Sequence, residues 1–240
     1  MSNIENTHPT PTPIPTPFPD IDQIVTADAN TTTNTNTNTN TNIPLVQSLV
    51  NVNMPTIYGH FNLILFKHVD NDQDHLALVK GTWNHNEPIP VRIHSSCITG
   101  DIFASCRCDC GDQLHKAMQI IDHHGKGIIL YMNQEGRGIG LLNKLKAYNL
   151  QEQGLDTVQA NIALGFKPDQ RDYTISAHIL RHLDVQSILL ISNNPNKHNA
   201  LIQHGFHIQH TIPIQIQSNP FNISYLITKR DKMQHTLHSL

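Results

Sequence analysis

Apolar residues repeat along this chain with two different periods, and each period predicts one kind of element. Short apolar runs bounded by glycine, proline or polar residues predict strands. Apolar residues three or four positions apart predict helices, because residues at that spacing share one face. The expected strands are residues 60–68, 75–81, 90–97, 127–132 and 187–192, and the expected helices are residues 112–125, 139–154, 171–185 and 194–205.

The order of these elements predicts the fold class. In the helix over 112–125, Leu114, Met118 and Ile121 form an apolar stripe. Leu142 and Leu145 begin a similar stripe in the next helix. The first two strands are expected to be antiparallel neighbours. Strands and helices then follow in turn, which indicates an α/β or α+β class: a single domain with a mixed β-sheet and helices packed on it.

Neither of these two periods occurs in the first fifty residues. Residues 9–19 are rich in proline, and residues 30–42 repeat asparagine and threonine, so almost nothing in them can be buried. We therefore expect residues 1–50 to be a disordered low-complexity leader and residues 51–237 to form the folded domain.

Composition limits the location and the partners. The N-terminus lacks the basic and apolar stretches of a secretion signal, and no apolar run reaches the length of about 18 residues that spans a membrane. We expect a cytoplasmic protein that does not bind membranes. The net charge of −3 lacks the basic surplus of a nucleic-acid-binding protein, so no nucleic-acid partner is expected.

All four cysteines lie between residues 97 and 110. Thiols stay reduced in the cytoplasm, where clustered cysteines more often bind metal or react than form disulfides. Cys106, Cys108 and Cys110 alternate, so an extended segment would point them to one side. Three thiolates with one open position are typical of catalytic zinc, and four are typical of structural zinc. Buried structural cysteines are the alternative.

A glycine-rich segment, YMNQEGRGIGLLNK at residues 131–144, follows one strand and opens a helix. The backbone of such a loop can approach a phosphate or a sugar closely. Its spacing matches neither common phosphate-binding motif, so a tight turn is the alternative. Glu135 and Arg137 favour ligand binding, because a carboxylate accepts from a purine N–H and a guanidinium binds oxyanions.

Two later loops carry further candidates. Asp169 and Arg171 lie just before a helix, where an acid for proton transfer and a cation for a phosphoryl oxygen share one loop. A helix cap with a surface charge is the alternative there. Residues 192–199, SNNPNKHN, end a strand and include Lys197, a candidate phosphate contact.

Together these segments resemble the GTP cyclohydrolase II family. The matching pieces are VRIHSSCITGD, CRCDCGDQL, YMNQEGRGIGLLNKLKAYNLQEQGLDTVQANIALGF, DQRDY, SNNPNK and YLITKRDKM, which extend over residues 54–237. The resemblance implies a hydrolase that opens the imidazole ring of GTP and releases formate and pyrophosphate at the first step of riboflavin biosynthesis. Many relatives carry a second enzyme domain upstream, where a leader is expected here, so the single-function form is implied.

The resemblance also implies ligands and partners. It assigns one catalytic zinc ion per chain to Cys97, Cys108 and Cys110, and it leaves Cys106 as a packing residue or spectator thiol. GTP is the implied substrate, with Mg²⁺ on its triphosphate, and a homodimer is the implied assembly.

Roles for individual residues follow from the same resemblance. It assigns proton transfer to Asp169, with Tyr148 as a second candidate base, and action at the α-phosphorus to Arg171. Because an arginine with a pKa above about 12 is a poor nucleophile, an electrostatic clamp is the alternative role for Arg171. The implied substrate contacts are Arg92, Ile93, His94, Ser95, Ser96, Gln113, Glu135, Gly136, Arg137, Thr157, Ser192 and Lys197.

Two positions depart from the family pattern. Ser192 replaces a threonine and keeps the hydroxyl, whereas Ser96 replaces a glutamate beside a zinc ligand. The loss of that carboxylate leaves two alternatives open. One is a diverged zinc-dependent paralogue that acts on another purine nucleotide, and the other is a non-catalytic nucleotide-binding protein.

Overall fold

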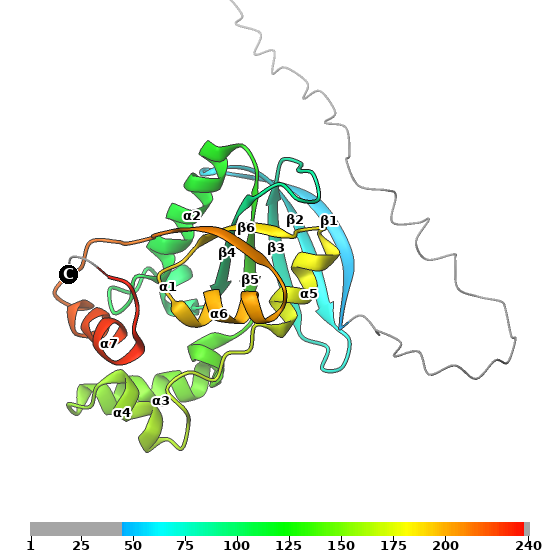
Figure 1. Cartoon of the computed structure of the whole chain (residues 1–240). Coiled ribbons are helices and arrows are strands. Elements are labelled where there is room, and N and C mark those ends of the chain that lie inside the picture. Colours follow the sequence, from blue (N-terminus) through cyan, green and yellow to red (C-terminus); the bar gives the residue numbers. More distant parts are fainter. Residues whose placement is uncertain (1–44, 238–240) are drawn as a thin grey trace, which may run out of the picture. The chain divides into compact units, whose positions relative to one another are not determined.

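The structure is a computed structural model that describes residues 45–237 (Figure 1). Nearly all of the expected leader, residues 1–44, lies outside the described residues. The strands are β1 (Val46–Thr56), β2 (Gly59–His68), β3 (Asp74–Lys80), β4 (Ile89–Ser95), β5 (Gly127–Met132), β6 (Ser187–Ile191) and β7 (His207–Ile212). The helices are α1 (Ile98–Asp101), α2 (Cys110–His124), the 3₁₀ turn η2 (Glu135–Gly138), α3 (Gly140–Glu152), α4 (Thr157–Ala163), α5 (Thr174–His182), α6 (Pro195–Gln203) and α7 (Ile223–Met233).

The strands form one mixed sheet in the order β1-β2-β3-β5-β4-β6-β7. From β1 to β5 the neighbours are antiparallel, and from β5 to β7 they are parallel. This arrangement confirms the expected mixed sheet and the antiparallel pairing of β2 with β3. Because β4, β5 and β6 are parallel, their carboxyl ends lie at the same edge of the sheet.

Helices cover both faces of this sheet (Figure 1). On one face, α5 and α6 contribute residues such as Leu180 and Leu201 to the larger core. On the other face, α2 packs Met118 and Ile121 against the sheet. Side chains alternate along a strand, so β4 buries Val91 and Ile93 in the larger core and directs Arg92 and His94 to the α2 side.

The expected boundary of the leader is wrong at its C-terminal end, because β1 begins at Val46. Val46 is 4% exposed, pairs with His68 and belongs to the larger core. Most other side chains of β1 are exposed, including Val50 and Val52. The strand is therefore stabilised by its pairing with β2 more than by burial, and it lacks the apolar pattern that marks a buried strand.

The apolar stripe expected for the helix over 139–154 does not face the core. Leu142 is 67% exposed and Leu145 is 46% exposed, while α3 buries Lys144 and Ala147. The spacing correctly predicts a helix, but the buried face of that helix carries a charged residue that faces the thiols.

Candidate active site

A pocket lies where the loops after β4, β5 and β6 meet α2, α3, α4 and α7. Among the described residues, its walls include seven lysine or arginine residues and a single carboxylate, that of Glu135. The chain as a whole has a net charge of −3, so this pocket concentrates positive charge within a mildly acidic protein. Such a pocket suits a small polyanion.

Three thiols cluster in one part of the pocket. The Sγ atoms of Cys97, Cys108 and Cys110 all lie within 4.8 Å of one another, and those of Cys97 and Cys108 are 3.7 Å apart. Tetrahedral zinc with Zn–S bonds of about 2.3 Å separates its sulfur ligands by about 3.8 Å. A Cβ atom on Gly100 would lie 2.8 Å from the Cys108 sulfur, so only glycine fits beside the thiols. The three residues therefore fit a zinc ion with one open position.

The three thiols come together through a turn, and the expected extended segment is wrong. Cys97 precedes α1, and Cys110 is the first residue of α2. Cys106 is exposed whereas Cys108 is buried, so alternation does not place these two on one side. Exposure also excludes the packing role expected for Cys106 and agrees with the expectation of a spectator thiol.

Asp101 holds the backbone of the first thiol-bearing residue. The Cys97 backbone N–H donates to Asp101 Oδ2 at 2.9 Å. The same carboxylate accepts from the Tyr131 hydroxyl at 2.9 Å and lies 3.1 Å from His94 Nε2. His94 therefore contacts the carboxylate that fixes the backbone of Cys97, and it does not contact Cys97 itself through these bonds.

Lys144 and Glu135 also contact the segment that begins at Cys97. Lys144 Nζ lies 2.8 Å from both Thr99 Oγ1 and Glu135 Oε1 and 3.1 Å from Cys97 Sγ. Glu135 Oε2 accepts from the Ile98 backbone N–H at 2.7 Å. Hydrogen bonds from Cys108 and Cys110, aided by the charge of Lys144, hold the pKa of Cys97 far below its usual range. These contacts favour the thiolate form of Cys97.

A group of buried cations forms another part of the pocket. Lys197 Nζ donates to the Ile93 backbone oxygen at 2.6 Å, and Arg92 donates to Gln113 Oε1 at 2.5 Å. Burial lowers the pKa of Arg92 to about 10. Burial, followed by repulsion from Arg92 and Arg171, holds the pKa of Lys197 well below its usual value. An anionic ligand would remove much of this repulsion.

Asp169 and Arg171 form a close ion pair. Arg171 Nε and Nη2 donate to the two carboxylate oxygens of Asp169 at 2.9 and 2.5 Å. Burial acts to raise the pKa of Asp169, but the hydrogen bonds and charge of Arg171 outweigh it and keep that pKa below its usual value. Asp169 is therefore ionised at neutral pH. Burial raises the pKa of Tyr148, so its phenol stays protonated there.

The glycine-rich loop turns sharply between β5 and α3. Gly136 and Arg137 both adopt the left-handed conformation, with φ of 64° and 61°. This conformation is uncommon for arginine. It places the Arg137 guanidinium over the Tyr225 ring, 5.5 Å from its centre, and leaves the buried Nη2 atom without a partner among the described residues. Arg137 thus has an unused donor in the pocket.

The structure brings most of the predicted site residues together. The pocket is lined by Arg92, His94, Ser95, Ser96, Cys97, Cys108, Cys110, Gln113, Glu135, Gly136, Arg137, Tyr148, Thr157, Arg171, Ser192 and Lys197. Two predicted residues do not line it. The side chain of Ile93 points into the larger core, and Asp169 reaches the pocket only through Arg171.

Several lining residues were not predicted from the sequence. Arg107 and Lys144 lie within matched segments, but nothing in their spacing marks them as pocket residues. Tyr225, Lys229 and His235 come from α7 and the residues after it. The matched segment YLITKRDKM includes Tyr225 and Lys229, whereas His235 lies beyond it. Within residues 45–237, no helix is both long and apolar enough to cross a bilayer.

Comparison with known proteins gives consistent results. The family profile described as GTP cyclohydrolase II matches residues 47–213. A riboflavin biosynthesis protein RibBA from Cytophaga hutchinsonii is 62% identical over 193 residues, which cover 80% of this chain and 48% of that protein. A RibBA from Parabacteroides distasonis is 53% identical over 196 residues, covering 82% of this chain and 48% of that protein. The chain thus spans about half the length of these relatives.

One solved structure is weakly similar to this chain. It is a chain described as RibBX, a two domain 3,4-dihydroxy-2-butanone 4-phosphate synthase from A. baumannii. The match has a TM-score of 0.40 and 24% identity, and it covers 74% of this chain and 42% of that one. At these values it carries no argument about function.

Proposed function

Because this chain belongs to the GTP cyclohydrolase II family, we propose that it opens the imidazole ring of GTP by hydrolysis and releases formate and pyrophosphate. The reaction would give a diaminopyrimidinone as the first step of riboflavin biosynthesis. One observation carries the proposal: a three-thiol cluster that fits zinc shares its pocket with a group of buried cations that fits a triphosphate.

The cations support binding of the nucleotide at its phosphate end. Arg92, Arg171 and Lys197 lie close enough for their charges to repel one another. A triphosphate relieves this repulsion, and Mg²⁺ is proposed to accompany it because the phosphates carry several charges. Arg137, whose buried Nη2 atom has no partner in the described part of the chain, adds a donor to the same pocket.

The thiols support hydrolysis at the base. Cys97, Cys108 and Cys110 would hold the zinc ion, and Asp101, Glu135 and Lys144 keep Cys97 in place. When bound, the ion supplies the Lewis acidity that activates water for attack on C8 of guanine. Ser96 lines the pocket beside Cys97, and its buried hydroxyl has no partner among the described residues. This hydroxyl is available to the nucleotide where the family has a carboxylate.

The protonation states support distinct roles for three residues. Asp169 is ionised and is proposed to accept protons. Tyr148, expected from the sequence as a second candidate base, is protonated, so we propose instead that it donates. Neighbouring charges, including that of Asp169, raise the pKa of Arg171 above its usual value despite burial. A guanidinium that keeps its proton is a poor nucleophile, so we assign Arg171 to stabilising charge on the α-phosphate.

The test is product analysis with the zinc-loaded protein. Incubation with GTP and Mg²⁺ should yield formate, pyrophosphate and the ring-opened product by mass spectrometry, and Cys108→Ser should yield no formate. A panel of other purine nucleotides tests the alternative that Ser96 motivates. Formate from another nucleotide but not from GTP would favour the diverged paralogue, and formate from none would favour a nucleotide-binding protein.

We also propose a homodimer. Leu141, Leu142 and Leu145 of α3 and Ile162 of α4 are exposed large apolar residues on two helices that pack together. Exposed apolar residues on adjacent elements are typical of a contact surface, and a second copy of this chain is the proposed partner. The cytoplasmic location and the single-function form stay predictions.

A further inference from the structure

The C-terminal helix α7 contributes a wall of the pocket, although it lies beyond the residues that the family profile matches. Leu226 is 1% exposed and Lys229 is 8% exposed, so one face of α7 is firmly packed. After the helix, the Thr236 backbone N–H donates to the Asn193 oxygen at 3.0 Å. This bond ties the end of the described chain to the loop that follows β6.

Lys229 connects α7 to the thiol segment. Its Nζ lies 2.7 Å from Asp109 Oδ1, and both residues are buried, at 8% and 2% exposure. Asp109 lies between Cys108 and Cys110 in the sequence. A buried carboxylate requires a partner, so Lys229 stabilises Asp109 in its present place.

Asp109 in turn fixes two residues of the pocket wall. Its Oδ2 accepts from Gln113 Nε2 at 2.6 Å, and Gln113 Oε1 accepts from Arg92 Nη2 at 2.5 Å. The carboxylate can only accept at neutral pH, so it directs the amide nitrogen of Gln113 toward itself. The amide oxygen must then point to Arg92. A continuous chain of hydrogen bonds joins Lys229, Asp109, Gln113 and Arg92.

We infer that Lys229 is a positioning residue for nucleotide binding, which acts through Asp109 on Gln113 and Arg92. The ligand is a purine nucleoside triphosphate, so this inference rests on the proposed function. Without the cation, the carboxylate of Asp109 moves toward solvent, and the Gln113 amide and Arg92 lose their fixed orientation. Nucleotide binding then weakens, while the thiols remain in place.

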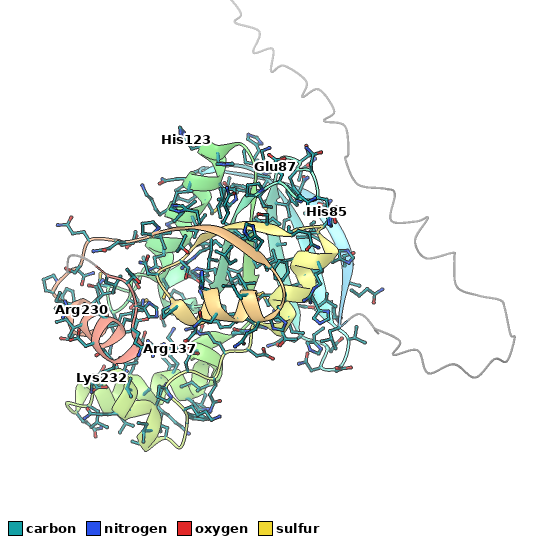
Figure 2. All side chains as sticks on the ribbon, in the orientation of Figure 1. His85, Glu87, His123, Arg137, Arg230 and Lys232 are labelled. Atoms are coloured by element: carbon teal, nitrogen blue, oxygen red, sulfur yellow. The ribbon has the colours of Figure 1, made fainter. Side chains whose placement is uncertain are left out.

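The experiment compares two substitutions on the same helix. Lys229→Met removes the buried cation, and Arg230→Met removes an exposed one that pairs only with its neighbour Asp231 among the described residues. In Figure 2, Arg230 lies on the side of α7 that faces away from α3. Binding of guanosine α,β-methylene triphosphate to the zinc-loaded full chain is measured by calorimetry, with zinc content and GTP kinetics determined in parallel.

Lys229→Met should raise the Kd for the analogue and the KM for GTP about tenfold. The kcat should change much less, the zinc content should stay the same, and Arg230→Met should leave all of these unchanged. Lys229→Arg should keep tight binding, because it keeps the cation. If Lys229→Met does not fold, Lys229→Gln can still donate one hydrogen bond to Asp109, and it should weaken binding in the same direction.

A double-mutant cycle tests whether Lys229 acts through Gln113. Adding Lys229→Met to Gln113→Ala should weaken binding little further, because the residue it positions is already gone. Additive effects, unchanged binding in folded Lys229→Met, or loss of zinc from that variant would each overturn the inference. If the unaltered protein does not bind the analogue, the proposed function itself fails, which is a separate result.

Discussion

The Lys144 ammonium group lies 3.1 Å from the sulfur of Cys97, and both groups are buried. Three thiolates bring one negative charge more than a Zn²⁺ ion neutralises. The adjacent cation offsets that excess charge, so Lys144 favours retention of both the thiolates and the metal. Glu135 holds Lys144 in this place through a bond of 2.8 Å.

Lys144→Met should therefore lower the affinity for zinc by about tenfold or more, the range typical of residues that contact metal ligands. The measurement is competition for zinc against a chromophoric chelator. Lys146→Met removes an exposed lysine from the same helix and serves as the control. Equal zinc affinity in the two variants would show that the charge of Lys144 does not support the metal.

The four cysteines should divide into ligands and a spectator. Cys97→Ser, Cys108→Ser and Cys110→Ser should each lose zinc, because each removes one of three clustered thiols. Cys106→Ser should keep about one zinc ion per chain, since Cys106 is exposed and lies outside the cluster. Metal analysis of the purified variants distinguishes the cases. A Cys106→Ser protein without zinc would instead indicate a four-thiolate structural site.

Arg171 should affect phosphate chemistry more than metal binding. Arg171→Ala removes a largely buried cation and takes from Asp169 the arginine with which it forms an ion pair. Pyrophosphate release from GTP should fall on the order of a hundredfold, while the zinc content stays unchanged. Lys167→Ala removes an exposed cation from the same loop and should have little effect. Normal pyrophosphate release by Arg171→Ala would contradict the assigned role.

The proposed dimer depends on the exposed leucines of α3. Leu142→Glu places a charge on a side chain position that is 67% exposed, and it should shift the protein to the mass of a monomer in sedimentation velocity. Ile202→Glu alters an apolar residue of α6 that is 50% exposed, and it should leave the mass unchanged. A Leu142→Glu protein that sediments like the unaltered one would place any interface elsewhere.

Buried elements with continuous apolar runs were predictable from the sequence, whereas exposed or polar ones were not. The strands β4, β5 and β6 are buried on both faces, so their apolar runs mark them. By contrast, β1 and β7 mix polar and apolar residues without a continuous apolar run and have little burial, and neither was expected. Pairing with a neighbouring strand stabilises β1 and β7. The sequence of one strand alone does not show which strand it pairs with.

The same distinction applies to the site. Local motifs predicted the glycine-rich loop, the Asp169 and Arg171 pair and a metal site among the four cysteines, and the family resemblance chose Cys97, Cys108 and Cys110 as its ligands. The contact between Lys229 and Asp109 joins residues 120 positions apart and could not be predicted from spacing. The alternation along β4 turns the side chain of Ile93 into the core, so the proposed substrate contact at Ile93 would have to come from its backbone.

Buried histidines should make the fold sensitive to mild acid, and His75 is the clearest case. His75 is 2% exposed, and its Nδ1 accepts from the Asn133 backbone N–H at 3.2 Å, which requires the neutral ring. Burial, aided by repulsion from His68, lowers the pKa of His75 to about 4. In the unfolded chain this histidine binds a proton near pH 6.5. The stability that depends on the neutral His75 ring is therefore fully present above about pH 6.5 and is lost as the pH falls toward 4.

One such histidine lowers the free energy of unfolding by on the order of 2 kcal/mol between neutral pH and about pH 5. His75→Asn should reduce this loss, because an amide oxygen can accept from Asn133 without titrating. His235, whose pKa burial lowers to about 3, should keep part of the pH dependence in the variant. Urea unfolding of both proteins at the two pH values measures the difference. If the variant loses as much stability as the unaltered protein, then His75 does not cause the acid sensitivity.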